Sequence, residues 1–135
     1  MEIIRAEHSG FCFGVRRALE KTIDQIEHNT DGRRIFTCGP LIHNTAVTDD
    51  LASRGVGIIS DLHEASAGDI VIVRSHGESE EFFVRAEAQG LDLVDATCPF
   101  VTRIHKLVRQ AKDQGRHVII VGDKNHPEVI GINGW

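Results

Sequence analysis

The run Asp69-Ile70-Val71-Ile72-Val73-Arg74 decides the fold that we expect for this chain. Its aliphatic residues are all β-branched and no polar residue alternates with them, so the segment is expected to be a strand buried on both faces. Strands of this kind belong to parallel sheets that are covered by helices on both sides. The sequence therefore predicts an α/β fold, a parallel sheet with helices on both faces.

The same alternation of strand and helix extends outward from this run in both directions. Expected strands cover residues 3–6, 35–38, 57–59, 91–94 and 117–121, and expected helices cover residues 15–26, 45–53, 78–89 and 99–114. Apolar residues at helical spacing and glycines after the last turns indicate the helices. Connections of a few residues favour βαβ units. The last unit has no completed helix, so we expect a fragment of a longer protein.

Size and composition exclude several classes of protein. A chain of 135 residues with 41% apolar residues is large enough for one core, and its apolar runs are far shorter than the roughly 20 residues of a membrane span. The first residues lack an export signal, which predicts a cytoplasmic protein with no membrane partner. A net charge of −5 and the absence of tyrosine argue against a nucleic-acid partner.

Residues with metal-binding, acid–base or anion-binding chemistry follow the expected strands. In parallel sheets, ligands bind beyond the carboxyl ends of the strands, where loops and helix starts converge. The residues at that address are Cys12, His43, His76, Cys98, His126 and Glu128. Their repeated placement at one edge of the sheet predicts a shared site.

Two of these loops resemble helix starts that carry a reactive side chain. Pro99 and Pro127 suit the first helical position, which places Cys98 and His126 at the caps. The positive end of a helix dipole favours a thiolate at Cys98, the form that ligates metal. Cys12 lies between Gly10 and Gly14, where the backbone can approach a bulky group closely.

Simpler interpretations hold for other residues. Cys38 lies inside an expected strand and is interpreted as a small buried hydrophobe. A zinc site is disfavoured because the chain has no close cysteine pair, and a serine hydrolase is disfavoured because no Gly-x-Ser-x-Gly elbow occurs. The remaining histidines are interpreted as caps or solvated surface residues: His8, His28, His63, His105 and His117.

Five motifs together resemble the 4-hydroxy-3-methylbut-2-enyl diphosphate reductase family, in the family's order. They are Ser9-Gly10-Phe11-Cys12-Phe13-Gly14-Val15, Gly39-Pro40-Leu41-Ile42-His43-Asn44, Arg74-Ser75-His76-Gly77, Asp95-Ala96-Thr97-Cys98-Pro99 and His126-Pro127-Glu128-Val129. The resemblance extends over essentially the whole chain, which corresponds to about half of a family member.

The resemblance implies reductive removal of an allylic hydroxyl from a small allylic diphosphate, giving isopentenyl and dimethylallyl diphosphates in the non-mevalonate isoprenoid pathway. It implies a 4Fe-4S cluster ligated by Cys12 and Cys98, with the third cysteine supplied by the family's C-terminal part. An electron donor such as ferredoxin or flavodoxin is also implied. His43, His76 and His126 match residues of the diphosphate pocket, and Glu128 matches the catalytic acid.

Family members are built of three similar α/β lobes. The resemblance implies that residues 1–98 form the first lobe and that residues 99–135 begin a truncated second lobe. With two of three cluster ligands, the chain alone is expected to be inactive. The rival hypothesis is a stand-alone α/β phosphate-binding or regulatory module that keeps the histidine loops and holds no cluster.

Overall fold

The computed structural model describes residues 2–135 and contains one parallel sheet with its helices. The elements, in chain order, are α1 (Phe13–His28), β1 (Ile35–Cys38), α2 (Thr45–Ser53), β2 (Val56–Ile59), the 3-10 helix η1 (Leu62–Glu64), β3 (Ile70–Val73), α3 (Glu80–Ala88), β4 (Asp92–Asp95), α4 (Pro99–Asp113) and α5 (Pro127–Asn133). Among these residues, no helix has the length and apolar character needed to cross a bilayer.

Strand β3 lies in the middle of the sheet, as its sequence predicts. The four strands are parallel in the order β2-β1-β3-β4, and Ile72 of β3 is aligned with Thr37 of β1 and Val94 of β4. All residues of β3 are buried. The predicted parallel sheet is therefore confirmed.

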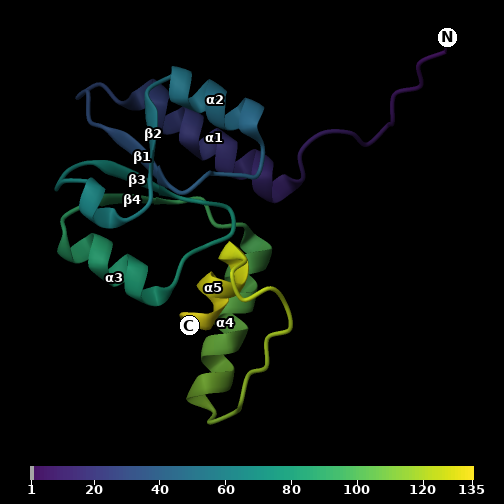
Figure 1. Cartoon of the computed structure of the whole chain (residues 1–135), viewed down its shortest axis with the longest axis vertical. Helices are drawn as coiled ribbons and strands as arrows, with labels where there is room; N and C mark the ends of the chain where they lie inside the picture. Colours follow the sequence, from purple (N-terminus) through teal and green to yellow (C-terminus); the bar gives the residue numbers. More distant parts are fainter. Residues whose placement is uncertain (1) are drawn as a thin grey trace.

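Helices cover both faces of the sheet because successive side chains of a strand point in opposite directions. Ile70 and Ile72 pack in one core with residues of α1 and α2, including Ala18 and Leu51. Val71 and Val73 face the opposite core, which contains residues of η1 and α3. Figure 1 shows α1 and α2 together above the strands and α3 below them.

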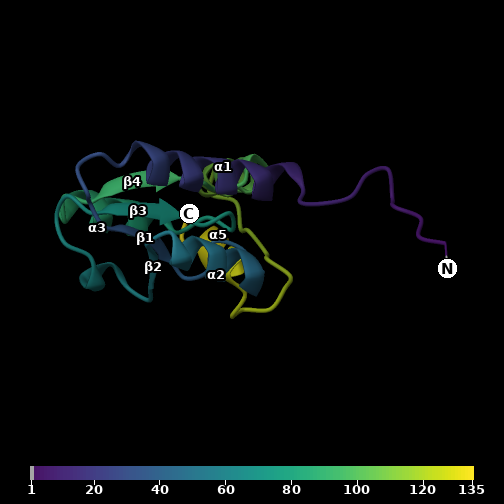
Figure 2. The ribbon, with the colours of Figure 1, turned by 90° about the horizontal axis from the view of Figure 1, so that it is seen from above.

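Two expected strands are wrong. Residues 3–6 and 117–121 have no regular structure and are largely exposed, and Ile4 retains 84% of its accessible surface. A strand needs a neighbour to pair its backbone N–H and C=O groups, and no described strand lies beside either segment. The residues before α1 run away from the rest of the chain in Figures 1 and 2.

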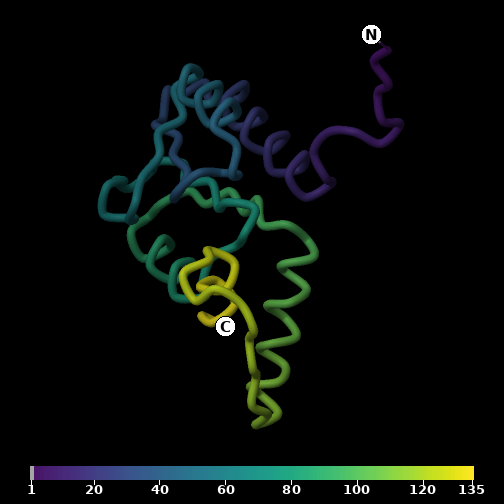
Figure 3. The backbone as a smooth tube through the Cα atoms, turned by 45° about the vertical axis from the view of Figure 1, so that its right-hand side comes forward, coloured from purple at the N-terminus to yellow at the C-terminus, as the bar shows by residue number. Residues whose placement is uncertain are grey.

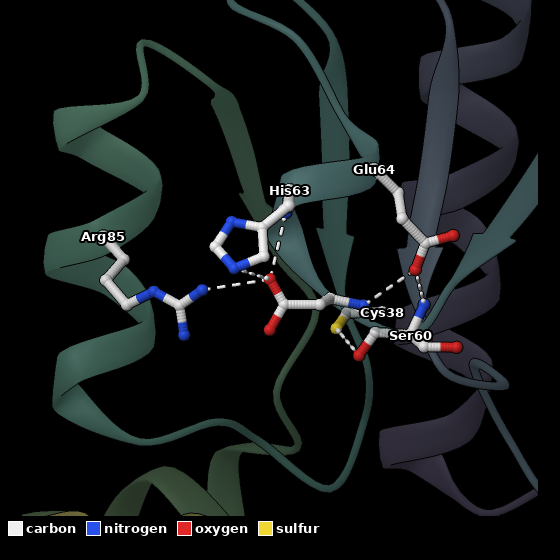
Figure 4. A network of polar contacts seen from close by, with 6 residues as sticks. Cys38, Ser60, His63, Glu64 and Arg85 are labelled. Carbon is white, nitrogen blue, oxygen red and sulfur yellow. Dashed lines mark hydrogen bonds and ion pairs between the residues drawn. The ribbon is translucent and has the colours of Figure 1, made fainter.

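Side-chain capping sets two element boundaries that hydrophobic periodicity misses. Helix α3 begins at Glu80 rather than at residue 78, because Ser79 accepts a hydrogen bond from Phe82 N and acts as the N-cap. The short helix η1 was not expected. It is held by a capping box in which Asp61 accepts from His63 N and Glu64 accepts from Asp61 N, as Figure 4 shows.

The central position of β3 predicts a large cost for truncating its side chains. We expect Ile72→Ala to lower the free energy of unfolding by about 2–5 kcal/mol, because Ile72 is fully buried. The matched variant Ile3→Ala should change it by less than about 0.5 kcal/mol, because Ile3 is 82% exposed. Urea denaturation measures both, and an equal loss in the two variants would contradict the observed sheet.

Candidate functional site

The order of the strands creates a point where loops diverge. The chain leaves β1 toward β2 and leaves β3 toward β4, so the connections of these neighbouring strands run in opposite directions along the sheet. Ligands of doubly wound folds bind at such a switch point. His43 lies in the connection after β1 and His76 in the connection after β3, so both residues flank this point.

A tight turn after β3 presents His76. Gly77 N donates to Arg74 O over 3.0 Å, and Gly77 has a φ of 77°, which favours glycine. Arg74 and Glu78 close the turn with an ion pair of 2.8 Å whose side chains are only 17% and 11% exposed. Burial raises the pKa of Glu78, and the Arg74 charge opposes that rise.

Ser75 joins the loop of His43 to the loop of Cys98. Its hydroxyl donates to Leu41 O over 3.3 Å, two residues before His43. Its carbonyl accepts a hydrogen bond of 2.9 Å from Cys98 N. Since Ser75 is buried, these bonds fix the relative positions of three strand-to-helix connections.

Three imidazole rings meet at the switch point. His43 and His76 follow strands as predicted, whereas the strand expected before His126 does not form and His126 reaches the cluster as the cap of α5. The ring centroids of His43 and His76 lie 4.7 Å apart, and His126 lies 5.8 Å from His76 and 6.2 Å from His43. His126 is the N-cap of α5, where its Nδ1 accepts from Glu128 N over 3.3 Å. Its neutral ring therefore carries its proton on Nε2 and can donate it to an anion.

His76 is held in the neutral form in the free protein. Burial, together with the neighbouring His43, Arg74 and His126, lowers the pKa of His76 to about 4. Its buried Nδ1 has no hydrogen-bond partner among the described residues. A bound anion favours the charged form of an imidazole, so this group is ready to take up a proton when an anion binds.

A cavity of about 540 Å³ opens beside His43 at the start of α2. Asn44 caps this helix by accepting a hydrogen bond from Val47 N. The first N–H groups of a helix and its dipole favour anions, and Thr45 and Thr48 add hydroxyl groups to the cavity wall. The surroundings of His43 therefore suit a phosphorylated ligand.

Cys12 and Cys98 occupy equivalent positions at neighbouring helix starts. Each is an N-cap without a side-chain hydrogen bond, Cys12 on α1 and Cys98 on α4. A Cβ added at Gly14 would lie 2.5 Å from Cys98 Sγ, so only glycine lets α1 approach this sulfur so closely. Arg17 holds the two helices together by donating to Thr97 O over 3.0 Å.

These two thiols fit part of an iron–sulfur site. Cysteine thiolates are the usual ligands of such clusters, and the absence of a side chain at Gly14 leaves space beside the sulfur of Cys98. Within residues 2–135, no group of three or more histidine, cysteine or carboxylate side chains is arranged so that it could hold a metal ion. The described residues therefore supply two cysteines and no complete metal site.

Cys38 has a different environment, in agreement with its expected place inside a strand. It ends β1, and its Sγ faces Ser60 O at 4.0 Å beside the network of Asp61 and Glu64 (Figure 4). Burial and the nearby carboxylate of Glu78 raise the pKa of Cys38 to about 11. This thiol is far less prepared to become a metal-ligating thiolate.

Glu128 lies in the first turn of α5, as predicted, and is half-buried. Periodicity alone missed the polar groups that support the site, which are the ion pair of Arg74 and Glu78 and the buried His105. The expectation of a solvated His105 is wrong, because this side chain is 4% exposed and lies on the buried side of α4. Its spacing from Val101, which is also buried, is the signal that identifies this side.

The environments of the cysteines predict an order of alkylation. In a brief iodoacetamide pulse at about pH 8, Cys12 and Cys98 should react at least about tenfold faster than Cys38, because a raised pKa leaves few thiolates. Mass-spectrometric peptide mapping measures the labelling. In concentrated guanidinium the three rates should become similar. A folded-state rate at Cys38 equal to that at Cys98 would refute the distinction.

Comparison with known proteins places this geometry in a family. The family model described as LytB protein matches residues 3–135. The 4-hydroxy-3-methylbut-2-enyl diphosphate reductase of Alkaliphilus oremlandii is 46% identical over all of this chain, which spans 48% of that relative. The reductase of the same name from Clostridium tetani is 44% identical, and the chain spans 21% of it.

Two solved structures are similar as well. A structure of (E)-4-hydroxy-3-methyl-but-2-enyl diphosphate reductase, named as the terminal enzyme of the non-mevalonate pathway, is 43% identical with a TM-score of 0.84, covering 98% of this chain and 46% of that one. The E-1-hydroxy-2-methyl-but-2-enyl-4-diphosphate reductase of Plasmodium falciparum has a TM-score of 0.89 at 33% identity, covering 95% and 40%. The chain belongs to the LytB family.

Proposed function

We propose that this chain supplies the diphosphate-binding and proton-donating part of a 4-hydroxy-3-methylbut-2-enyl diphosphate reductase. The observation that carries the proposal is the convergence of His43, His76 and His126 at the switch point of a sheet whose relatives bear that name. The chain spans about half the length of the first relative described above. The complete reaction is therefore proposed for a protein of family length.

The histidines bind the diphosphate in this proposal. His126 donates from Nε2, since its Nδ1 is occupied by Glu128 N. His43 lies at the capped start of α2, where free N–H groups favour the same negative charge. His76 becomes protonated as the anion binds, which strengthens its hydrogen bond to a phosphate oxygen.

Glu128 is the proposed proton donor. It follows the His126 cap by two residues, so it lies at the edge of the imidazole cluster on the same helix start. Loss of an allylic hydroxyl requires a proton on the departing oxygen, and the allyl fragment requires a second proton at carbon. A positioned carboxylic acid that is reprotonated from solvent can deliver both.

Cys12 and Cys98 would hold a 4Fe-4S cluster together with a third cysteine from outside this chain. When bound, the cluster supplies single electrons and a Lewis-acidic iron for the hydroxyl oxygen. The required electrons come from a small carrier such as ferredoxin or flavodoxin. Three free cysteines suit the reducing cytoplasm, where we place the reaction.

The division into lobes is part of the same proposal. In chain order, β4 is the last strand of the sheet, and the helices that cover the sheet precede it. Helices α4 and α5 follow β4 and pack against each other beyond the sheet (Figure 1). We therefore assign residues 1–98 to a first α/β lobe and residues 99–135 to the beginning of a second.

A stand-alone anion-binding module is the second candidate. It is favoured by the three imidazole rings, which could hold an anion without any cofactor. The module and the reductase share the histidine cluster and differ in the cluster cofactor, so an experiment must report on both.

Binding of inorganic diphosphate tests the histidine cluster. We expect His76→Asn to raise the Kd by at least about tenfold, the scale of one charge-assisted hydrogen bond. Since the pKa of His76 is about 4 without the anion and rises with it, binding to the unsubstituted chain near pH 5.5 should take up protons. Calorimetry in two buffers of different ionisation enthalpy measures this uptake.

The matched control is His63→Asn. The His63 side chain is 74% exposed and forms its ion pair with Asp61 rather than with the imidazole cluster, so both the Kd and the proton uptake should remain unchanged. The diphosphate also exchanges protons of its own on binding, and the His63→Asn variant measures the uptake with the imidazole cluster intact. Unchanged affinity in His76→Asn would eliminate the cluster as the anion site.

Glu128→Gln tests the proton donor in a protein of family length that begins with this sequence. After anaerobic reconstitution with iron and sulfide, the visible absorption of the cluster and the Kd for diphosphate should match those of the unsubstituted protein. Turnover with a chemical reductant should fall by about 10²-fold or more. The 135-residue chain alone should not turn over.

Each result has a defined consequence. No visible absorption at family length would leave the stand-alone module as the function. An unchanged rate in Glu128→Gln would remove Glu128 from the mechanism while leaving the diphosphate site intact. Robust turnover by the 135-residue chain would refute the need for a third cysteine.

A further inference from the structure

His105 is a buried imidazole that the proposed reaction does not use. It lies on α4, outside the motifs of the site, and its side chain is 4% exposed. Its Nε2 is buried without a hydrogen-bond partner among the described residues. A polar atom in this state costs free energy, so the retention of a ring here needs a physical reason.

The ring lies directly against the turn that presents His76. A Cβ added at Gly77 would lie 2.6 Å from His105 Cε1 and 3.3 Å from its Nε2. Gly77 is therefore restricted twice, by its positive φ and by the imidazole beneath it. Because packed interiors leave few voids, removal of this ring would leave the turn without support.

The same turn also contacts α5. A Cβ at Gly131 would lie 3.3 Å from Gly77 O, so α5 rests on the turn through two glycines. Glu80 N also donates to Gly134 O over 3.3 Å. Figures 1 and 3 place α5 between α3 and α4. The position of Glu128, at the start of α5, thus depends on where the turn lies.

Trp135 packs against the ring of His105. The two rings are stacked at a centroid distance of 5.1 Å and an angle of 20°. Trp135 Nε1 donates to Glu78 O over 3.0 Å, which ties the indole to the residue after Gly77. The guanidinium of Arg109 lies over the indole at 5.1 Å. The imidazole is therefore held by packing.

The charges around His105 do not give it a titrating role at neutral pH. Burial lowers the pKa of His105, although the carboxylates of Asp95 and Glu128 act in the opposite direction. His105 lines a cavity of about 260 Å³ together with the cationic side chains of Lys106 and Arg109. A neutral, stacked ring acts through its shape.

We propose that His105 is a positioning residue that supports the His76–Gly77 turn and, through it, the start of α5 that carries His126 and Glu128. The inference rests on the proposed diphosphate site, since it assigns a support to that site. It predicts that an aromatic ring is required at this position and that the imidazole nitrogens are dispensable.

The test uses the 135-residue chain with the variants His105→Ala, His105→Phe and, as a control, His117→Ala at an exposed position outside the helices and strands. Imidazole NMR follows the pKa of His76, and calorimetry gives the Kd for inorganic diphosphate. In His105→Ala the turn loses its support and admits water, so the pKa of His76 should rise by about 1 or more and the Kd by about tenfold. His105→Phe should restore both values to within about threefold in Kd, and His117→Ala should change neither.

Two outcomes overturn the proposal. An unchanged pKa of His76 and an unchanged Kd in His105→Ala would show that the turn needs no support. An equal loss in His105→Phe and His105→Ala would assign the effect to a ring nitrogen. If His105→Ala does not fold, Trp135→Leu removes the stacked partner instead, and an unchanged pKa of His76 in that variant would also overturn the proposal.

The two readouts separate this inference from the function on which it rests. If the unsubstituted chain does not bind diphosphate, the proposed function fails. The pKa of His76 needs no ligand, so it still decides whether His105 positions the turn. If the unsubstituted chain binds diphosphate, and the His105 variants have the same pKa of His76 and the same Kd as that chain, the inference alone fails.

Discussion

The parallel pairing of β3 with β1 and β4 is the interaction on which the candidate site depends. A buried strand that pairs on both sides fixes the carboxyl ends of its neighbours at one edge of the sheet. Because the chain leaves β1 and β3 in opposite directions, His43 and His76 are left facing each other at that edge. No long-range charge attraction is needed to bring these histidines together.

Helix starts explain how an acidic chain can offer an anion site. Cys12, Cys98 and His126 are the N-caps of α1, α4 and α5, and His43 immediately precedes the cap of α2. The N–H groups and the dipole of a helix start favour an anion locally, whereas the net charge of −5 is the sum over all residues. Local geometry therefore outweighs global charge.

Glycines allow this crowding of helix starts. Gly14 lets α1 lie against Cys98 Sγ, and Gly77 lets the turn of His76 lie between His105 and Gly131. Because glycine has no side chain, the backbone itself makes each contact, and the elements lie closer together than larger residues would permit. The resulting layers leave His76 half-buried, and this burial is the main cause of its low pKa. Packing and electrostatics are thus set by the same residues.

The sequence alone determined the parallel sheet, most helix boundaries and the placement of His43 and His76 after strands, because β-branched runs, caps and strand ends are local signals. Tertiary structure decided the rest. Residues 3–6 and 117–121 have strand-like sequences, yet a strand forms only where a neighbour accepts its backbone hydrogen bonds. His105 is buried by its contacts with Trp135 and Gly77, which join distant parts of the chain. Arg74 pairs with Glu78 across the turn that contains Gly77. Helical spacing can identify the buried side of α4, but it does not give the partners that bury His105, since those contacts arise only when the elements pack.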